Sequence, residues 1–397
     1  MTDLVTDALV IGAGPAGSAT AALLADAGWR VLAIDRAAFP REKPCSEYMS
    51  PEAVRILDRL GVTAALCSAG AATLIGSSVT AARGARLVGR FPEGRGLSIA
   101  RRELDHALVR AAGARGVDVL ESTSFERLIM DGRRIGGAVI RGRDGELRNV
   151  RAAITIGADG LRSRMARALG GQRLGWPARV AFVAHVERVP AMADRAEMHV
   201  SGQGYVGLNA IGGGITNVAL VVPQQRAALA AGRVEAYFME ELERFPGVRG
   251  RVRPEHIVRE VLVTGPFAAR ARHVTAPGAL LVGDAADFFD PFTGEGICAA
   301  LAGGELVAQS LGGARGSLAA VDRALADYRR ARRRRFAGKW AVERLIGYAM
   351  TVPGLFDHAV ARIGRRRGMA DTLVGVTGAV LPARAVLNPL FLARMVL

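Results

Sequence analysis

Apolar and polar positions at the start of the chain follow a strand, turn, helix, strand order. Residues 8–11, Ala-Leu-Val-Ile, form a short apolar run of the kind expected for a buried parallel strand. A glycine-rich turn follows, and the stretch 18–28, rich in alanine and leucine, predicts a helix. The mostly apolar run 29–34 predicts a second strand. This order is typical of a Rossmann-type α/β unit.

The middle of the chain has a different pattern, dominated by short β-rich segments. Residues 129–150 contain two Asp-Gly turns and predict a hairpin. Partly alternating β-rich segments at 180–189, 196–201 and 204–223 predict an antiparallel sheet, and residues 226–245 predict a helix on its outside.

The last part of the chain returns to the first pattern and then becomes helical. The apolar run 279–282 predicts a strand, and residues 298–311 predict a helix of small residues. Residues 325–345 predict a solvated outer helix that carries four consecutive arginines. The region 346–397 is apolar with scattered arginines and is interrupted by prolines.

Composition limits the classes of function. The chain has 397 residues, a formal net charge of +16 and 53 basic residues, of which only Lys43 and Lys339 are lysine. The arginine bias is weak support for a nucleic-acid partner, and no zinc-finger or aromatic RNA-binding pattern accompanies it. We therefore expect no nucleic-acid partner, but a basic surface that attracts anions such as phosphorylated cofactors and acidic lipid.

The cysteines give no sign of a disulfide framework or a metal site. Cys45, Cys67 and Cys298 are far apart, and no histidine has metal-ligand spacing with them. The first ten residues lead directly into the first strand, with no apparent cleavable signal, and no run of 18 apolar residues occurs. These features predict a cytoplasmic location.

The first glycine turn has the GxGxxG spacing of a dinucleotide site. Gly12 permits the tight turn, Gly14 lets the backbone approach a pyrophosphate, and Gly17 lets helix and strand pack closely. The helix that follows presents free N–H groups to the phosphates. Asp35 comes 18 residues after Gly17, where a carboxylate accepts a ribose hydroxyl. The turn alone does not choose between FAD and NAD(P).

Two later segments favour FAD. A strand ends at Asp284, which can accept a hydrogen bond from a ribityl hydroxyl, and Pro291-Phe-Thr-Gly-Glu-Gly-Ile297 then leads into a helix. Its glycines let the helix N-terminus face a flavin ring carbonyl. The segment Gly157-Ala-Asp159-Gly160 also follows a predicted strand.

Together the three motifs resemble the FAD-dependent oxidoreductase superfamily of the p-hydroxybenzoate hydroxylase fold, over roughly residues 5–310. The resemblance implies that Asp159 belongs to a motif associated with FAD and NAD(P)H, and that Arg101 contacts the flavin. It implies these cofactor-binding residues: Gly12, Gly14, Ala16, Gly17, Asp35, Arg36, Arg101, Asp159, Asp284, Gly294, Gly296 and Ile297.

The predicted fold class is α/β, with a Rossmann-type FAD-binding domain interleaved with an antiparallel β-sheet substrate domain, and with a C-terminal helical region. The expected domains are a discontinuous FAD-binding domain (1–175 and 266–325), a substrate domain (176–265) and a C-terminal helical cap (326–397). The C-terminal region could cap the pocket or lie on an acidic membrane surface. The oligomeric state is left open.

The segment 39–51, which contains Pro44-Cys45, is similar to the geranylgeranyl reductase branch of the superfamily. Two departures stand out. The glycine run of that branch is replaced by Ser46-Glu-Tyr-Met49, and its aromatic substrate strand aligns with Tyr205–Ala210, which lacks the Trp, Phe and Pro. Halogenases are a poorer match, since no Trp-x-Trp-x-Ile-Pro segment occurs.

Two chemistries remain. The favoured prediction is an NAD(P)H-driven monooxygenase that hydroxylates a lipophilic or aromatic small molecule through a flavin C4a-hydroperoxide. The alternative is a reductase of C=C bonds in an isoprenoid or other lipophilic substrate. There Cys45 is the candidate proton donor or pocket wall, and Glu47 or Tyr48 relays protons. A flavoprotein dehydrogenase or a non-catalytic binder is a third class.

Overall fold

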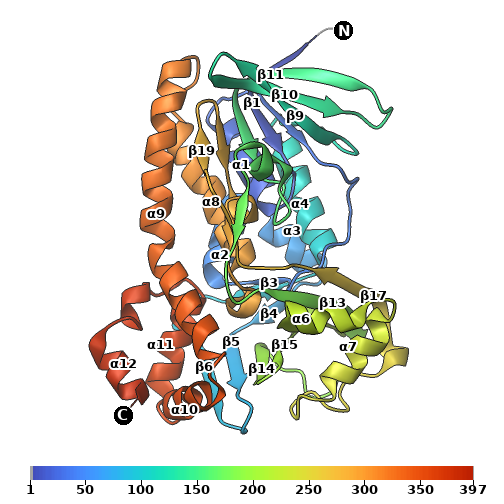
Figure 1. Cartoon of the computed structure of the whole chain (residues 1–397), viewed down its shortest axis with the longest axis vertical. Coiled ribbons are helices and arrows are strands. Elements are labelled where there is room, and N and C mark those ends of the chain that lie inside the picture. The colour runs from blue at the N-terminus through green and yellow to red at the C-terminus, as the bar shows by residue number, and fades with distance from the viewer. Residues whose placement is uncertain (1–2, 397) are drawn as a thin grey trace.

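The structure is a computed structural model that describes residues 3–396. The first strand–helix–strand unit lies at the centre of an eight-stranded sheet, in which β20, β11, β1, β2 and β8 are parallel neighbours (Figure 1). The carboxyl ends of these strands lie at one edge, where α/β folds bind their ligands. The strands are β1 Leu4–Ile11, β2 Val31–Ile34, β8 Asp118–Leu120, β9 Ser124–Asp131, β10 Arg134–Arg141, β11 Leu147–Gly157, β19 Thr275–Ala276 and β20 Ala279–Leu281.

The two faces of this sheet are covered differently. Ala8 and Val10 of β1 pack in a core that includes α1 (Pro15–Asp26), α4 (Arg101–Gly113) and α8 (Gly296–Leu311). Leu9 and Ile11 point the other way, into a core shared with the β9–β10 hairpin. Both faces are buried over residues 8–11, which explains why this half of β1 is an uninterrupted apolar run.

A second sheet of seven strands has the order β17-β13-β16-β15-β14-β5-β6. Its neighbours are antiparallel, except for the parallel pair β14 and β5. The strands are β5 Gly76–Thr80, β6 Arg86–Arg90, β13 Arg179–Glu187, β14 Arg195–Ser201, β15 Gly204–Gly212, β16 Ile215–Pro223 and β17 Ile257–Thr264. The predicted antiparallel sheet is present, but two of its strands come from residues 76–90 and lie outside the expected range 176–265.

Alternate residues of the seven-stranded sheet point to an outer and an inner face. On the outer face, Phe182 and Leu220 pack against Tyr237 and Phe238 of α7 (Val234–Leu242). The predicted single helix at 226–245 is instead interrupted: α6 Gln224–Ala227 continues into the 3-10 helix η1 Ala228–Ala230, and α7 begins after Gly232, which adopts a left-handed conformation with φ +73°. The inner face carries the polar residues described below.

Small sheets and short helices join the two large sheets. The segment after Cys45 forms β3, which pairs with β7 and so ties the region around residue 47 to the start of α4. These elements are α2 Pro51–Arg59, α3 Thr63–Ser68, α5 Arg164–Ala168, β3 Tyr48–Met49, β4 Ala72–Leu74, β7 Gly96–Ser98, β12 Gln172–Leu174, β18 Ala269–Ala271 and β21 Asp287–Phe288.

The C-terminal region is helical, as expected. Helix α9 (Leu318–Ala349) packs along α8 and runs the length of the molecule to a group of three helices beside β6 (Figure 1). These are α10 Pro353–Gly364, α11 Arg367–Thr377 and α12 Pro389–Val396. Helix α9 crosses the expected boundary at 325/326 without a break. Among the described residues, no helix combines the length and the apolar character needed to cross a membrane.

Candidate active site

The first glycine turn, Gly12–Gly17, lies at the carboxyl end of β1 and depends on glycine at two positions. Gly12 has φ +100°, and a Cβ there would lie 2.5 Å from the carbonyl oxygen of Ala158. A Cβ on Gly17 would lie 1.7 Å from the carbonyl oxygen of Gly12. The backbone therefore folds too tightly for any side chain at these positions. Gly14 has more space and is the N-cap residue of α1.

Asp35, at the end of β2, closes this turn. Its buried carboxylate accepts hydrogen bonds from the backbone N–H groups of Ala13 and Ala37, both at 2.9 Å. Arg36, the neighbouring predicted cofactor residue, is exposed. Asp35 thus lies beside the turn, as its spacing predicts.

The second turn, Gly157–Gly160, contacts the first directly, since Gly12 lies against Ala158 and Asp159. The Asp159 carboxylate accepts hydrogen bonds from Ser163 Oγ at 2.5 Å and from the backbone N–H groups of Arg164 and Met165 at 2.6 and 3.2 Å. It therefore stabilises the N-terminus of α5, a structural use that the motif did not predict.

The third turn, Gly283–Gly296, contacts the first at Gly283, where a Cβ would lie 2.8 Å from that of Ala16. Burial raises the pKa of Asp284, and the charges of Lys43 and Arg101 oppose this rise. The Asp284 carboxylate makes no hydrogen bond to any residue that the structure describes, so it is available to a ligand hydroxyl.

The far end of the third turn lies against β3. Gly294 has φ +70°, and a Cβ there would lie 2.6 Å from the ring of Tyr48. Gly296 and the buried Ile297 begin α8. Burial and the nearby Glu295 raise the pKa of Tyr48, so its hydroxyl remains protonated at neutral pH.

Three cations lie where the turns meet. The Cβ position of Gly14 is 3.5 Å from an Nη atom of Arg41 and 3.9 Å from one of Arg101, and that of Gly160 is 3.3 Å from Lys43 Nζ. Burial and the neighbouring arginines lower the pKa of Lys43. A pyrophosphate beside α1 would match both this charge and the open backbone at Gly14. The residues present therefore fit the diphosphate of FAD.

Arg101, which the resemblance implies as a flavin contact, points into the protein, whereas its neighbour Arg102 does not. Arg101 is buried and donates two hydrogen bonds of 2.8 Å to Asp105, which also forms an ion pair of 3.0 Å with Arg41. Burial alone would lower the pKa of Arg101, but Asp105 and the Cys45 thiol raise it above its ordinary value. Arg102 is exposed and pairs with Glu103.

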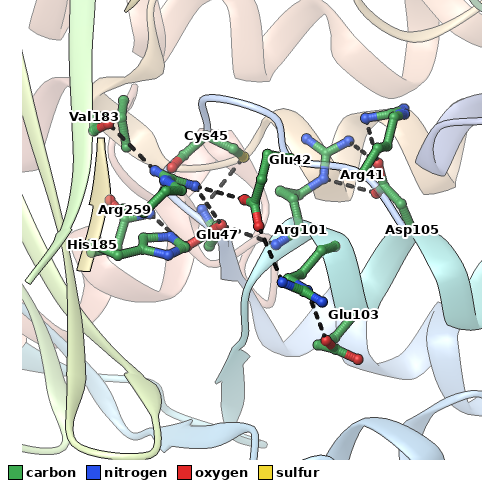
Figure 2. Close-up of polar contacts among 12 residues, drawn as sticks. Arg41, Glu42, Cys45, Glu47, Arg101, Glu103, Asp105, Val183, His185 and Arg259 are labelled. Carbon is green, nitrogen blue, oxygen red and sulfur yellow. Dashed lines mark hydrogen bonds and ion pairs between the residues drawn. The ribbon is translucent and has the colours of Figure 1, made fainter. Parts of the chain in front are cut away.

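A buried polar cluster lies beside this arginine, and Figure 2 shows how its side chains converge. Glu47 has no exposed surface. Its carboxylate accepts a hydrogen bond of 2.9 Å from the backbone N–H of Arg101, lies 2.7 Å from Nε2 of His185, and accepts one of 2.9 Å from the amide of Asn217. Arg259 is 3.7 Å away. We call these five residues the Glu47 cluster.

The cluster joins both sheets. His185, Asn217 and Arg259 lie on the inner faces of β13, β16 and β17, whereas Glu47 and Arg101 belong to the segment before β3 and to the start of α4. Glu47 has φ +61°, an unfavourable conformation for a side chain with a Cβ, which the hydrogen bonds around it hold in place. Within the described residues, Oδ1 of Asn217 and Nε of Arg259 are buried without a hydrogen-bond partner.

Cys45 is connected to this cluster through its backbone. Its carbonyl oxygen accepts a hydrogen bond of 2.6 Å from Asn217, and its Sγ lies 3.4 Å from the backbone nitrogen of Glu47. The structure thus brings together the three predicted catalytic candidates, Cys45, Glu47 and Tyr48, but Tyr48 points toward Gly294 and not toward the Glu47 cluster.

A second buried ion pair lies farther along the inner face. Arg179 of β13 contacts Asp290 at 2.5 Å, and the Tyr205 hydroxyl donates a hydrogen bond of 2.7 Å to the same carboxylate. The Tyr205 ring meets Phe292 edge to face, with 5.2 Å between centroids. This pair fixes the loop that carries the third turn against the sheet.

Sequence reasoning missed the role of several of these residues. Arg41 and Lys43 lie within the segment that drew attention to Cys45, yet only the fold brings them to Gly14 and Gly160. Asn217 and Arg259 are scattered polar residues in otherwise apolar strands, and that interruption of the pattern was the available signal.

The fold and the glycine turns define a flavoprotein oxidoreductase with a dinucleotide-binding domain. A family model described as "FAD binding domain" matches residues 5–342, so the chain belongs to this family and is an FAD-dependent oxidoreductase, which confirms the sequence-based resemblance. Menaquinone reductase of Mycobacterium tuberculosis H37Rv is 30% identical over 333 residues, 77% of this chain and 76% of that protein. Digeranylgeranylglycerophospholipid reductase of Methanosarcina mazei is 29% identical over 318 residues, 77% of this chain and 74% of that protein.

Solved structures show the same fold. The myxobacterial chondrochloren halogenase CndH superposes with a TM-score of 0.80 at 25% identity, over 87% of this chain and 83% of that one. A flavoprotein/dehydrogenase from Cytophaga hutchinsonii gives a TM-score of 0.82 at 20% identity, over 98% and 95% of the two chains.

Proposed function

We propose that the protein is a reductase that uses FAD to saturate a C=C bond in a lipophilic, isoprenoid-bearing substrate. This reverses the order of the two chemistries that the sequence favoured. The reductases of M. tuberculosis and M. mazei match three quarters of this chain, and their names refer to reduction of isoprenoid-bearing lipids.

The observation that carries the proposal is the buried contact of 2.7 Å between Glu47 and His185, on the segment that also holds Cys45. Reduction of an alkene needs a hydride at one carbon and a proton at the other. A carboxyl and an imidazole in contact can hold one proton between them, away from solvent. An acid placed in this way suits a reaction whose proton must reach carbon.

Bound FAD would supply the hydride, after reduction by a nicotinamide nucleotide. The residues of this chain would do the rest. Lys43 and Arg41 would hold the diphosphate, and Asp284 would accept a ribityl hydroxyl. The Glu47–His185 pair would store the proton, and the neighbouring Cys45 thiol would donate its own proton to the substrate carbon and be reprotonated by that pair.

The inner face carries an apolar cluster that would line the substrate site. Ala181, Val183 and Val221 lie on it and form one apolar cluster with Phe288 and Phe292 of the third-turn segment. Small and branched side chains of this kind suit a prenyl chain, and a water-poor site strengthens the electrostatic effects of the neighbouring charges.

Monooxygenation of a lipophilic or aromatic compound is the second candidate. It is favoured by Tyr205–Ala210, which lacks the Trp, Phe and Pro of the reductase branch and offers Asn209 instead. The Asn209 amide donates a hydrogen bond of 2.6 Å to Ser98, which bonds in turn to the carbonyl of Glu47. This polar inner face could orient a hydroxylated ring.

Product analysis with and without oxygen separates the two. The purified holoprotein is reduced with NADPH or dithionite and mixed with a menaquinone or a polyprenyl lipid. The mass of the product is then determined by mass spectrometry. The proposal predicts, in the absence of oxygen, a gain of two hydrogen atoms in the prenyl chain that remains after any quinone ring has been reoxidised. Incorporation of one oxygen atom, seen only when oxygen is present, would establish the second candidate instead.

A further inference from the structure

A groove between α11 and α12 is separate from the flavin site. Its volume is about 410 Å³. It lies in the group of C-terminal helices beside β6, at the end of the molecule opposite the β9–β10 hairpin (Figure 1). Its lining combines arginine side chains with apolar ones and includes no acidic residue. The principal lining residues are Arg366, Arg367, Arg394, Met369, Leu390 and Phe391.

The surrounding region is strongly basic. Residues 344–397 contain seven arginines and two aspartates. Both aspartates accept hydrogen bonds from the backbone of the β5–β6 hairpin. Asp357 accepts a hydrogen bond of 2.7 Å from the backbone N–H of Arg83, and Asp371 accepts one of 2.8 Å from that of Arg90. These bonds attach the helices to the β5–β6 hairpin and leave the groove without a neutralising carboxylate.

The three arginines of the groove are not equivalent. Arg366 donates a hydrogen bond of 2.9 Å to the carbonyl oxygen of Arg394 and so holds the end of α12 next to the start of α11. The side chains of Arg367 and Arg394 are exposed and form no ion pair with any residue that the structure describes. Two guanidinium groups at this groove are therefore available to an anion.

Apolar side chains beside the groove are exposed. Leu390, at the start of α12, is 59% exposed although it is next to the buried Phe391. Helix α10 packs against α12, and its N-terminal end exposes Val352 and Leu355. Arginines beside exposed leucines are typical of surfaces that bind acidic membranes, because the cations meet the phosphates and the apolar side chains enter the acyl boundary.

We propose that this groove binds the phosphate of an anionic phospholipid and holds the protein on a membrane surface. The exposed Leu390 favours a lipid over a free phosphate, since a soluble anion would gain nothing from an apolar side chain beside it. The proposal does not depend on the reaction, since the groove residues take no part in the flavin site.

Vesicle sedimentation with the full-length holoprotein tests the proposal. We expect binding to phosphatidylcholine vesicles that contain phosphatidylglycerol and little binding to pure phosphatidylcholine. The double variant Arg367→Ala/Arg394→Ala should weaken binding to the anionic vesicles by roughly 30-fold, from about 1 kcal/mol per arginine near the surface. Addition of Leu390→Ser to this double variant should weaken vesicle binding further. The flavin content should remain unchanged in all variants.

The matched control is Arg329→Ala/Arg333→Ala, which removes two exposed arginines from α9. Equal losses in both double variants would show attraction by net charge alone and overturn the groove as the site. Inorganic phosphate provides a second arm. If phosphate binds to the protein and this binding is lost in the groove variant, while anionic vesicles do not bind, the groove serves a soluble phosphate and the membrane proposal is wrong.

Discussion

The flavin edge of the parallel sheet and the inner face of the seven-stranded sheet are built on different principles. At the flavin edge, the backbone forms the site: glycines at 12, 17 and 283 leave no space for side chains, and three turns meet. On the inner face, side chains form the site, since a buried carboxylate is held by four residues from four elements. A backbone-built site needs particular residues at fixed local spacing, whereas a side-chain network needs only that distant residues meet.

The largest expected effect is at the flavin edge. Gly17→Val would place side-chain atoms within the volume of the Gly12 carbonyl, where even a Cβ lies at 1.7 Å. We expect the variant to lose bound FAD almost completely, measured as the ratio of flavin absorbance to protein absorbance. Gly113→Val is the control, because a Cβ at Gly113 has no neighbour within 4 Å. Full flavin content in the Gly17 variant would contradict the convergence of the turns.

A large effect on stability is expected on the inner face. Glu47→Ala removes the carboxylate and leaves His185 buried without its hydrogen-bond partner, whereas Asn217 keeps the Cys45 carbonyl and Arg259 keeps Glu42. The free energy of unfolding should fall by about 3–5 kcal/mol, the usual cost of breaking a buried charged pair from one side. Glu103→Ala, which removes an exposed carboxylate, should change it by less than about 0.5 kcal/mol. Denaturant titration measures the free energy of unfolding of both variants. Similar small losses would mean that the Glu47 cluster does not hold the two sheets together.

A smaller effect on stability is expected from Glu295, a titratable residue in the third turn at the flavin edge. Burial raises the pKa of Glu295 from 4.5 to about 8, with Lys339 opposing and Glu343 adding to the rise. The folded state therefore binds a proton more readily than the unfolded state, so stability falls as pH rises from 4.5 toward 8. Near pH 6 to 7 the slope from this group should be about 1 kcal/mol per pH unit.

Glu295→Gln should remove this slope, and the exposed control Glu255→Gln should keep it. Thermal denaturation across this pH range measures both. Parallel curves for wild type and Glu295→Gln would show that the carboxyl is ionised in the folded protein.

The same contrast explains what the sequence could and could not predict. The Rossmann-type unit, the three turns and the antiparallel sheet were predicted because glycine spacing and strand periodicity are local signals. The meeting of Glu47 with His185, Asn217 and Arg259 was not, because the four residues are separated by up to about 200 positions. Glu47 was a candidate on its own, but no local pattern connects it to the other three. Strands β5 and β6 fall within the range 1–175 expected for the FAD-binding domain, and the sequence predicted neither strand nor their pairing with β14.

The most direct test of the account separates the two half-reactions in Glu47→Gln. Stopped-flow absorbance measures reduction of the bound FAD by NAD(P)H, and then its reoxidation by a menaquinone or polyprenyl substrate without oxygen. For Glu47→Gln we predict unchanged flavin content and an unchanged rate of flavin reduction, but reoxidation slowed by about 100-fold or more. Glu103→Gln serves as the control. An unchanged rate of reoxidation, with flavin content and fold intact, would contradict a role for the Glu47–His185 pair in supplying the proton.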